Sequence, residues 1–246
     1  MARPKTAGSI RAESLPSRIV RQVLEALFSR RLRPGDFLGT EAQMIDAYQA
    51  SRVPVREALG RLEALGVVHI KTGSGGGASI AAGESGQLAT ALAVQFMLLG
   101  VTAEEVFDAR IAVESRAAEL AAIRAEPDDI ERLNIMLADI RETRRTGEEA
   151  VEAILAYHLA VVETSRARTL IALMQALSRA LRNLYVDAAH PADSVGAATG
   201  YRSLGEVLKR IEARDAAGAS RAMHEHLLRQ RDYVVRRLAA SKSTGS

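Results

Sequence analysis

Two arginines, Arg52 and Arg56, are the residues whose type and spacing point most clearly to chemistry. They stand four positions apart in the string SRVPVREAL, so both fall on one face of a helix, while Val55 and Leu59 fall on another. Such a pair is in many proteins only a solvated pair of charges. On an exposed helix it can also donate bidentate hydrogen bonds to guanine in the major groove of DNA.

The surrounding residues predict the elements that would position this pair. Pro34 to Asp36 form a turn, and Thr40 can cap a short helix that follows it. Ser51 can cap the next helix, and Pro54 fits its first turn because backbone N–H groups there have no helical partner. A longer helix is expected to precede both, at about residues 16–30.

A hairpin is predicted directly after the second helix. The runs VVHIK at 67–71 and ASI at 78–80 flank the glycine-rich string TGSGGG. Helix, helix and hairpin in this order form the pattern of a winged helix-turn-helix, in which the second helix reads DNA. The sequel to the arginine pair therefore favours DNA binding over a solvated charge pair.

Composition limits the classes of protein. The chain has 246 residues, of which 48% are hydrophobic, enough for two domains with separate cores. It contains no cysteine, which excludes disulfides, thiolate metal sites and a cysteine nucleophile. No run of about 18 apolar residues and no apolar signal core is found. We therefore expect a cytoplasmic protein without a membrane partner.

The charge is divided unevenly along the chain. Residues 1–82 carry 12 Lys and Arg against 7 Asp and Glu, a net charge of +5, whereas residues 83–246 carry 21 against 23. Duplex DNA is the partner that suits the basic half, because aromatic residues make up only 4% of the chain and offer few stacking platforms for single strands. The predicted domains are a DNA-binding domain at 1–80, a polar linker at 81–86 and a helical domain at 87–246.

Everything after the linker is predicted to be helical, as a bundle of about six or seven helices, so the chain as a whole is mainly α. The breaks come at glycine, proline and polar strings. The expected helices lie at about 86–99, 102–125, 127–146, 148–164, 168–190, 197–213 and 216–240.

Three polar residues interrupt the apolar stripes of this bundle: Arg110, His158 and His226. A buried charge or imidazole needs a partner. One interpretation pairs Arg110 with Glu114 and makes the histidines satisfied core residues. The other places all three around a ligand, with His224 pointing elsewhere because it is two residues from His226.

The N-terminal strings resemble the GntR family of bacterial transcription regulators. The shared features are the turn Pro34 to Asp36, the helix string from Ser51 to Leu59, and the wing glycine Gly77. This resemblance implies that Arg52 and Arg56 read base edges in the major groove. It also implies that Thr40 and Ser51 contact phosphates and that Gly77 brings the wing to the minor groove. The predicted DNA-contacting residues are Thr40, Ser51, Arg52, Val53, Arg56 and Gly77. The chain departs from the family at Gly39, usually proline, and at Ala42, often arginine.

The helical half resembles the effector domain of the FadR-like branch, called the FCD domain. The matching strings are DARIAVE at 108–114, AYHLA at 156–160 and RDAAGASRAMHEHL at 214–227. The resemblance implies a cavity for a small effector and, in many relatives, a divalent metal held by one Asp and three His. Here only His158 and His226 match, and the two other ligand positions are Ile154 and Leu204. We therefore expect no metal cofactor, with these histidines as the only candidate metal ligands.

The sequence thus predicts a ligand-responsive transcription regulator, by family default a repressor, that binds an inverted-repeat operator as a homodimer. Its effector is expected to be a small carboxylate or acyl compound, bound by Arg110, His158 and His226. Two alternatives stay open: a bundle that only dimerises, and a metal-assisted carboxylate sensor. An enzyme is not expected, because no GxSxG, P-loop or HExxH motif occurs and no catalytic residue stands out.

Overall fold

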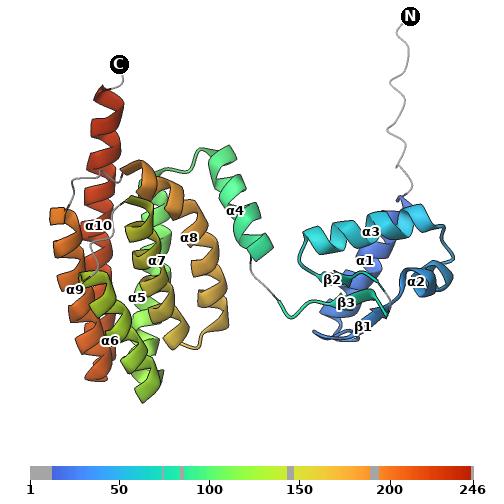
Figure 1. Cartoon of the computed structure of the whole chain (residues 1–246), viewed down its shortest axis with the longest axis horizontal. Helices are drawn as coiled ribbons and strands as arrows, with labels where there is room; N and C mark the ends of the chain where they lie inside the picture. The colour runs from blue at the N-terminus through green and yellow to red at the C-terminus, as the bar shows by residue number, and fades with distance from the viewer. Residues whose placement is uncertain (1–12, 74, 84–85, 143–146, 189–193, 245–246) are drawn as a thin grey trace, which may run out of the picture. The chain divides into compact units, whose positions relative to one another are not determined.

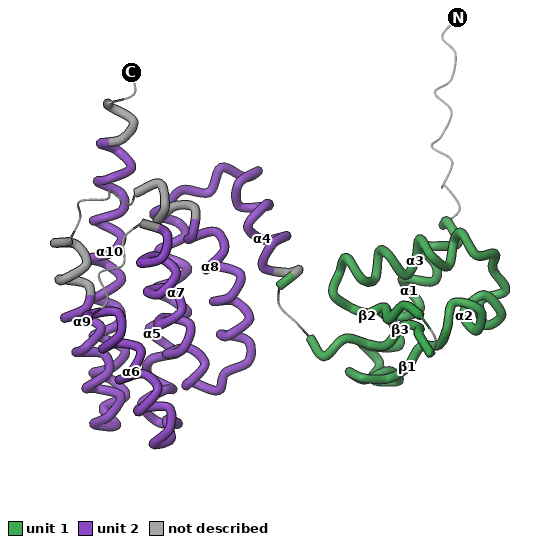
Figure 2. Tube along the Cα trace, in the orientation of Figure 1, with its two compact units in different colours: residues 1–87 green, residues 88–246 purple. Residues whose placement is uncertain are grey.

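The structure is a computed structural model that describes residues 13–73, 75–83, 86–142, 147–188 and 194–244. The chain divides into two compact units, residues 1–87 and residues 88–246, drawn in green and purple in Figure 2. The linker expected at 81–86 includes residues 84 and 85, which lie outside the described residues, and the helix expected at about 86–99 begins at Gly86 as predicted. Within the described residues, no helix is long and apolar enough to cross a membrane.

The described residues of the first unit form three helices and a small antiparallel sheet (Figure 1). Its elements are α1 (Leu15–Phe28), β1 (Phe37–Gly39), α2 (Glu41–Tyr48), α3 (Arg52–Ala64), β2 (Val68–Lys71) and β3 (Gly77–Ile80). Ser14 caps α1 by accepting a hydrogen bond from the backbone N–H of Ser17, and Thr40 forms a capping box with Gln43 at α2. Apolar stripes of the helices meet one face of the sheet in a single core. The fully buried members include Ile19, Val23, Met44, Val55 and Leu62.

The sheet has one strand more than the predicted hairpin. β1 pairs with β3, which in turn pairs with β2, so the strand order is β1-β3-β2. The sequence analysis assigned only a turn before Thr40 and missed β1, because three residues are too few to show an alternating pattern. This short strand ties the turn before α2 to the wing.

The second unit is a bundle of helices, as predicted. Its members are α4 (Gly86–Leu99), α5 (Ala103–Arg124), α6 (Pro127–Glu142), α7 (Gly147–Thr164), α8 (Arg168–Ala188), α9 (Ser194–Glu212) and α10 (Ala216–Thr244). Among the described residues the predicted bounds differ by up to four residues, most at the end of α10, and the predicted ends of two helices, 143–146 and 189–190, lie outside the described residues. Thr102 and Glu105 form a capping box that fixes the start of α5. α5 packs against α7, α8, α9 and α10, so its side chains face the bundle on several sides.

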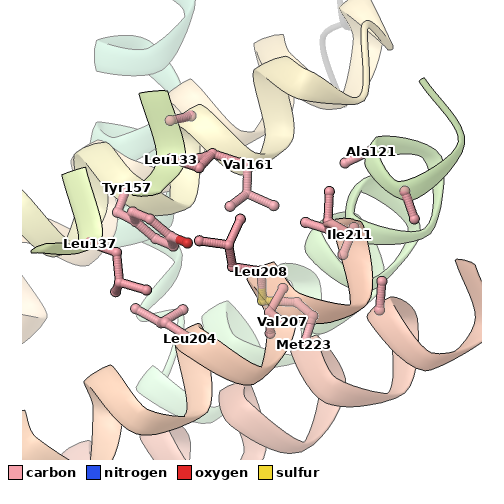
Figure 3. Packing of buried hydrophobic residues seen from close by; sticks show 14 of the residues in the cluster. Ala121, Leu133, Leu137, Tyr157, Val161, Leu204, Val207, Leu208, Ile211 and Met223 are labelled. Carbon is pink, nitrogen blue, oxygen red and sulfur yellow. The ribbon is translucent and has the colours of Figure 1, made fainter. Parts of the chain in front are cut away.

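The largest core cluster of this unit is shown in Figure 3, where side chains of α9 point toward α6 and α7. Leu204 is 1% exposed and lies in this cluster, and Ile154 packs against it. Small residues of α5, among them Ala118 and Ala121, allow α9 and α10 to approach closely. A second cluster is built around Phe107 and joins α5, α7, α8 and α10.

Candidate functional site

Helix α3, the predicted recognition helix, presents the predicted DNA-contacting residues Arg52, Val53 and Arg56 on its outer side. Arg52, Val53 and Arg56 are exposed, with Val53 at 73%. The opposite side is anchored in the core by Val55 and Leu62, both fully buried. Because the inner stripe fixes the rotation of the helix, the arginine face is held toward solvent.

Arg52 is already paired in this structure. Its Nε atom lies 2.7 Å from Oε1 of Glu41 at the start of α2, and its side chain is 73% exposed. An exposed ion pair contributes only about 0–1 kcal/mol, so Arg52 can exchange this partner for a base edge or phosphate at little cost. The pair connects α2 with the start of α3.

Thr40 and Ser51 stand before the first residues of α2 and α3, where backbone N–H groups attract anions. The Thr40 hydroxyl accepts from the backbone N–H of Gln43 at 3.2 Å, which leaves its own proton available to donate. Ser51 occupies the predicted N-cap position of α3, but its side chain makes no cap hydrogen bond. The third residue of the helix is Pro54, which has no N–H to donate to it.

Gly77 has a packing role besides the predicted one. It lies at the start of β3, where a Cβ atom would come within 2.7 Å of the Gly39 carbonyl oxygen and of the Phe37 ring. Only glycine therefore lets β3 pair with β1. Gly39, which departs from the family, has φ +129°, a backbone angle closed to proline.

The bundle brings together the three predicted effector-binding residues Arg110, His158 and His226, which lie far apart in the sequence. Arg110 Nε lies 2.5 Å from Glu114 Oε1, and His158 Nδ1 lies 2.5 Å from Glu114 Oε2. Nε2 of His158 is 3.3 Å from Nε2 of His226, whose Nδ1 is 2.7 Å from the Ser203 hydroxyl. The side chains of Arg110, Glu114, His158 and His226 are at most 1% exposed. We call these five residues, Arg110, Glu114, His158, His226 and Ser203, the polar chain.

The hydrogen bonds of the polar chain have one consistent direction. Glu114 is ionised, so His158 must donate from Nδ1, which leaves its Nε2 as an acceptor when the ring is neutral. His226 then donates from Nε2, and its Nδ1 accepts from the Ser203 hydroxyl. Both imidazoles can thus be neutral with all four ring nitrogens engaged.

The pKa directions agree with this assignment. Burial raises the pKa of Glu114, but the charge of Arg110 and the neighbouring His158 outweigh it and lower the pKa to about 2. Burial lowers the pKa of His158 below 6.5, against the attraction of Glu114. Burial, His158 and Arg110 hold the pKa of His226 well below 6.5. Near neutral pH the polar chain therefore has one Arg–Glu charge pair and two neutral rings.

The residues present do not fit the metal set of the FCD resemblance. The FCD resemblance implies the two other ligand positions at Ile154 and near Leu204, and both of these residues belong to the apolar packing around α9. Among the described residues, no group of three or more His, Cys, Asp or Glu side chains could hold a metal ion. Two imidazoles alone make an under-coordinated site, and Glu114 already bonds to Arg110 and His158.

Sequence reasoning found part of this site. The Arg110–Glu114 pair follows from its spacing of four residues. The second bond of Glu114, to His158, and the role of Ser203 were missed. Ser203 stands one residue before Leu204, and nothing in its sequence surroundings marks it as a partner of His226. His224 is exposed, as predicted.

A winged helix with an exposed arginine face, joined to a helical bundle with a buried polar site, defines the class of two-domain, DNA-binding transcription regulators. Comparison with known proteins identifies the family. Residues 15–76 match the bacterial regulatory proteins of the gntR family, and residues 105–229 match the FCD domain. The chain therefore belongs to the GntR family, and it is a transcription regulator with an FCD effector domain rather than an enzyme.

Individual relatives support this assignment. The chain is 31% identical to the HTH-type transcriptional regulator LutR of Bacillus subtilis (strain 168) over 150 residues. This matched stretch covers 61% of this chain and 68% of LutR. It is 25% identical over 228 residues to the Uncharacterized HTH-type transcriptional regulator YcbG of the same organism, covering 93% of each chain. The solved structure of Streptococcus agalactiae GntR covers 88% of this chain and 99% of its own, with a TM-score of 0.63 and 19% identity. That likeness shows a shared fold.

Proposed function

We propose that this protein is a repressor that binds an inverted-repeat operator as a homodimer, with one α3 helix in the major groove of each half-site. The observation that carries this proposal is the exposed face of α3, where Arg52 and Arg56 stand four residues apart on a helix anchored by its opposite side. One short helix reads only a few base pairs, so useful specificity requires two readers.

Selection of bound duplexes from a random pool by the full chain tests this function. The proposal expects an inverted repeat, with GT and AC half-site cores if the operators follow the family, bound by two chains per duplex. Light scattering of the complex gives the stoichiometry. Recovery of an asymmetric site bound by one chain would contradict dimeric reading, and no enrichment at all would contradict specific DNA recognition.

We propose further that the bundle binds a small organic acid or acyl compound at the polar chain, without a metal. The polar chain gathers buried polar groups at one place, and the apolar residues Ile154 and Leu204 stand close in sequence to His158 and Ser203. This combination suits a ligand with a polar head and an apolar body. The charge of Arg110 is already balanced by Glu114, so a ligand must rearrange the polar chain to reach it.

A thermal-shift screen of organic acids, acyl-CoAs and divalent metal ions tests the sensor role. A true effector should raise the melting temperature of the wild type and of His224→Asn, whose side chain is exposed, but not that of His226→Asn. The two histidines of the polar chain form their hydrogen bonds with other members of the chain. This favours a second candidate function, a bundle that only dimerises. A screen in which no compound protects the wild type would support that candidate.

A further inference from the structure

An ion pair between Glu41 and Arg52 joins the first residue of α2 to the first residue of α3. The two helices pack against each other (Figure 1), and Nε of Arg52 lies 2.7 Å from Oε1 of Glu41. This oxygen atom is shielded from solvent, and the only group of opposite charge that it meets among the described residues is this guanidinium. The capping box of Thr40 and Gln43 fixes the start of α2 and with it the position of Glu41. The carboxylate is therefore held beside the arginine face of α3.

This ion pair engages only one corner of the guanidinium group. An arginine carries its N–H donors in a planar fork, with one on Nε and the rest on the two Nη atoms. No other ion pair or hydrogen bond of the Arg52 side chain is found among the described residues, and the side chain is 73% exposed. Because Nε is occupied, the two Nη groups remain for a bidentate contact with O6 and N7 of guanine. Arg52 can thus read guanine without releasing Glu41.

We propose that Glu41 is a positioning residue for base reading: it holds Arg52 through Nε, so that the two Nη groups face guanine in the major groove. The inference deepens the proposed function and rests on it, because it requires α3 to lie in that groove. An exposed arginine loses rotamer freedom when it binds a base, and a partner that orders the side chain beforehand reduces this cost. α2 has no Lys or Arg of its own. At this pair of helices the readout therefore depends on the arginines of α3.

The charge of Glu41 also distinguishes base contacts from phosphate contacts. Paired with a carboxylate, Arg52 adds little net charge, so it contributes little to the sequence-independent attraction between the protein and the phosphates. Neutralising Glu41 should therefore, on charge alone, tighten binding to every duplex. If Glu41 positions Arg52, the same change should also weaken the preference for guanine. A loss of specificity without a loss of overall affinity is a result that a merely structural role of Glu41 would not give.

Glu41→Gln in the full chain tests the proposal, with Glu25→Gln as the matched control. Glu25 forms an exposed ion pair with Arg21 on α1, at 2.7 Å, so the control removes one negative charge from the same unit. Selection of duplexes with Arg52→Ala first identifies the operator position that Arg52 reads, as the position whose guanine preference is lost. Fluorescence anisotropy at fixed salt should then show that the preference of Glu41→Gln for guanine at this position is reduced about 10-fold, while its affinity for a random duplex is equal or higher. Glu25→Gln should keep the wild-type preference.

The double variant of Glu41→Gln and Arg52→Ala shows whether Glu41 acts through the arginine. Its base preferences should equal those of Arg52→Ala alone, because no guanidinium is left to position. The proposal would be overturned by an Arg52→Ala variant that keeps every base preference, or by an unchanged guanine preference in Glu41→Gln. A further loss in the double variant at a cytosine would also overturn it, because Glu41 would then accept a hydrogen bond from the base itself. In each case specific DNA recognition would stand, since it fails only if the wild-type chain enriches no duplex.

Discussion

Replacing Glu114 by glutamine is the sharpest perturbation of the helical unit. Glu114 is fully buried and joins Arg110 to His158 with two hydrogen bonds of 2.5 Å. Glutamine keeps the size of the side chain but removes the charge that balances the buried guanidinium. Removing one partner of a buried ion pair costs about 3–5 kcal/mol. The lowering of the Glu114 pKa from 4.5 to about 2 gives a similar value, about 3 kcal/mol in favour of the ionised form.

Urea unfolding of the full chain, followed by circular dichroism, measures this cost. Because the chain has two units, two transitions are expected, and only that of the helical unit should shift in Glu114→Gln. The matched control is Glu206→Gln, which removes an exposed partner of Arg210 at the same spacing of four residues and should cost less than about 1 kcal/mol. A loss below 1 kcal/mol in Glu114→Gln as well would refute the view that the polar chain is a fully coupled buried network.

Four further predictions follow from the described contacts. The helical unit should lose stability on acidification in two stages. Below pH 6.5 the histidines of the unfolded chain take up protons that the buried rings of His158 and His226 do not, and as the pH falls from 4.5 toward 2 the stabilising contribution of ionised Glu114 is lost. A flat stability profile between pH 7 and pH 3 would contradict both pKa directions. Nitrogen-15 NMR at neutral pH should show His158 protonated at Nδ1 and His226 at Nε2, and Ser203→Ala should disturb mainly the His226 signals; the opposite tautomers would reverse the direction of the polar chain. Gly77→Ala should destabilise the reader by about 1–3 kcal/mol because its Cβ meets backbone, whereas Gly60→Ala, which has no atom within 4 Å, should not lower stability; equal unfolding midpoints would disprove the close approach of β3 to β1. Protein prepared with a chelator should keep its fold and its operator affinity, and stoichiometric zinc or nickel that is lost in His158→Ala would show that other side chains complete a metal site.

The sequence predicted the fold well where local signals are strong. The capping residue Thr40, the stripe of Val55 and Leu62 and the glycine-rich wing depend on neighbours within a few positions, and each was predicted correctly. β1 was not predicted because its three residues owe their strand conformation to pairing with β3, which follows 40 positions later.

The polar site was predictable only in part for the same reason. The Arg110–Glu114 pair lies on one helix and follows from helical spacing. The contact between His158 and His226 spans 68 positions and depends on how α7 and α10 pack, which no local pattern encodes. Ser51 shows that a local signal can also mislead. The residue was recognised as an N-cap, but its side chain makes no cap hydrogen bond because Pro54, three positions later, has no N–H to donate.

Binding of wild type and Arg56→Ala to a selected inverted-repeat duplex and to a random duplex tests the central claim most directly. Fluorescence anisotropy at fixed salt gives both affinities. If Arg56 reads a base edge, the variant should lose about 1–3 kcal/mol on the selected duplex, with relaxed preference at one position per half-site and little change on the random one. An equal loss on both duplexes would mean that Arg56 contacts only phosphates and would contradict base reading by this face of α3.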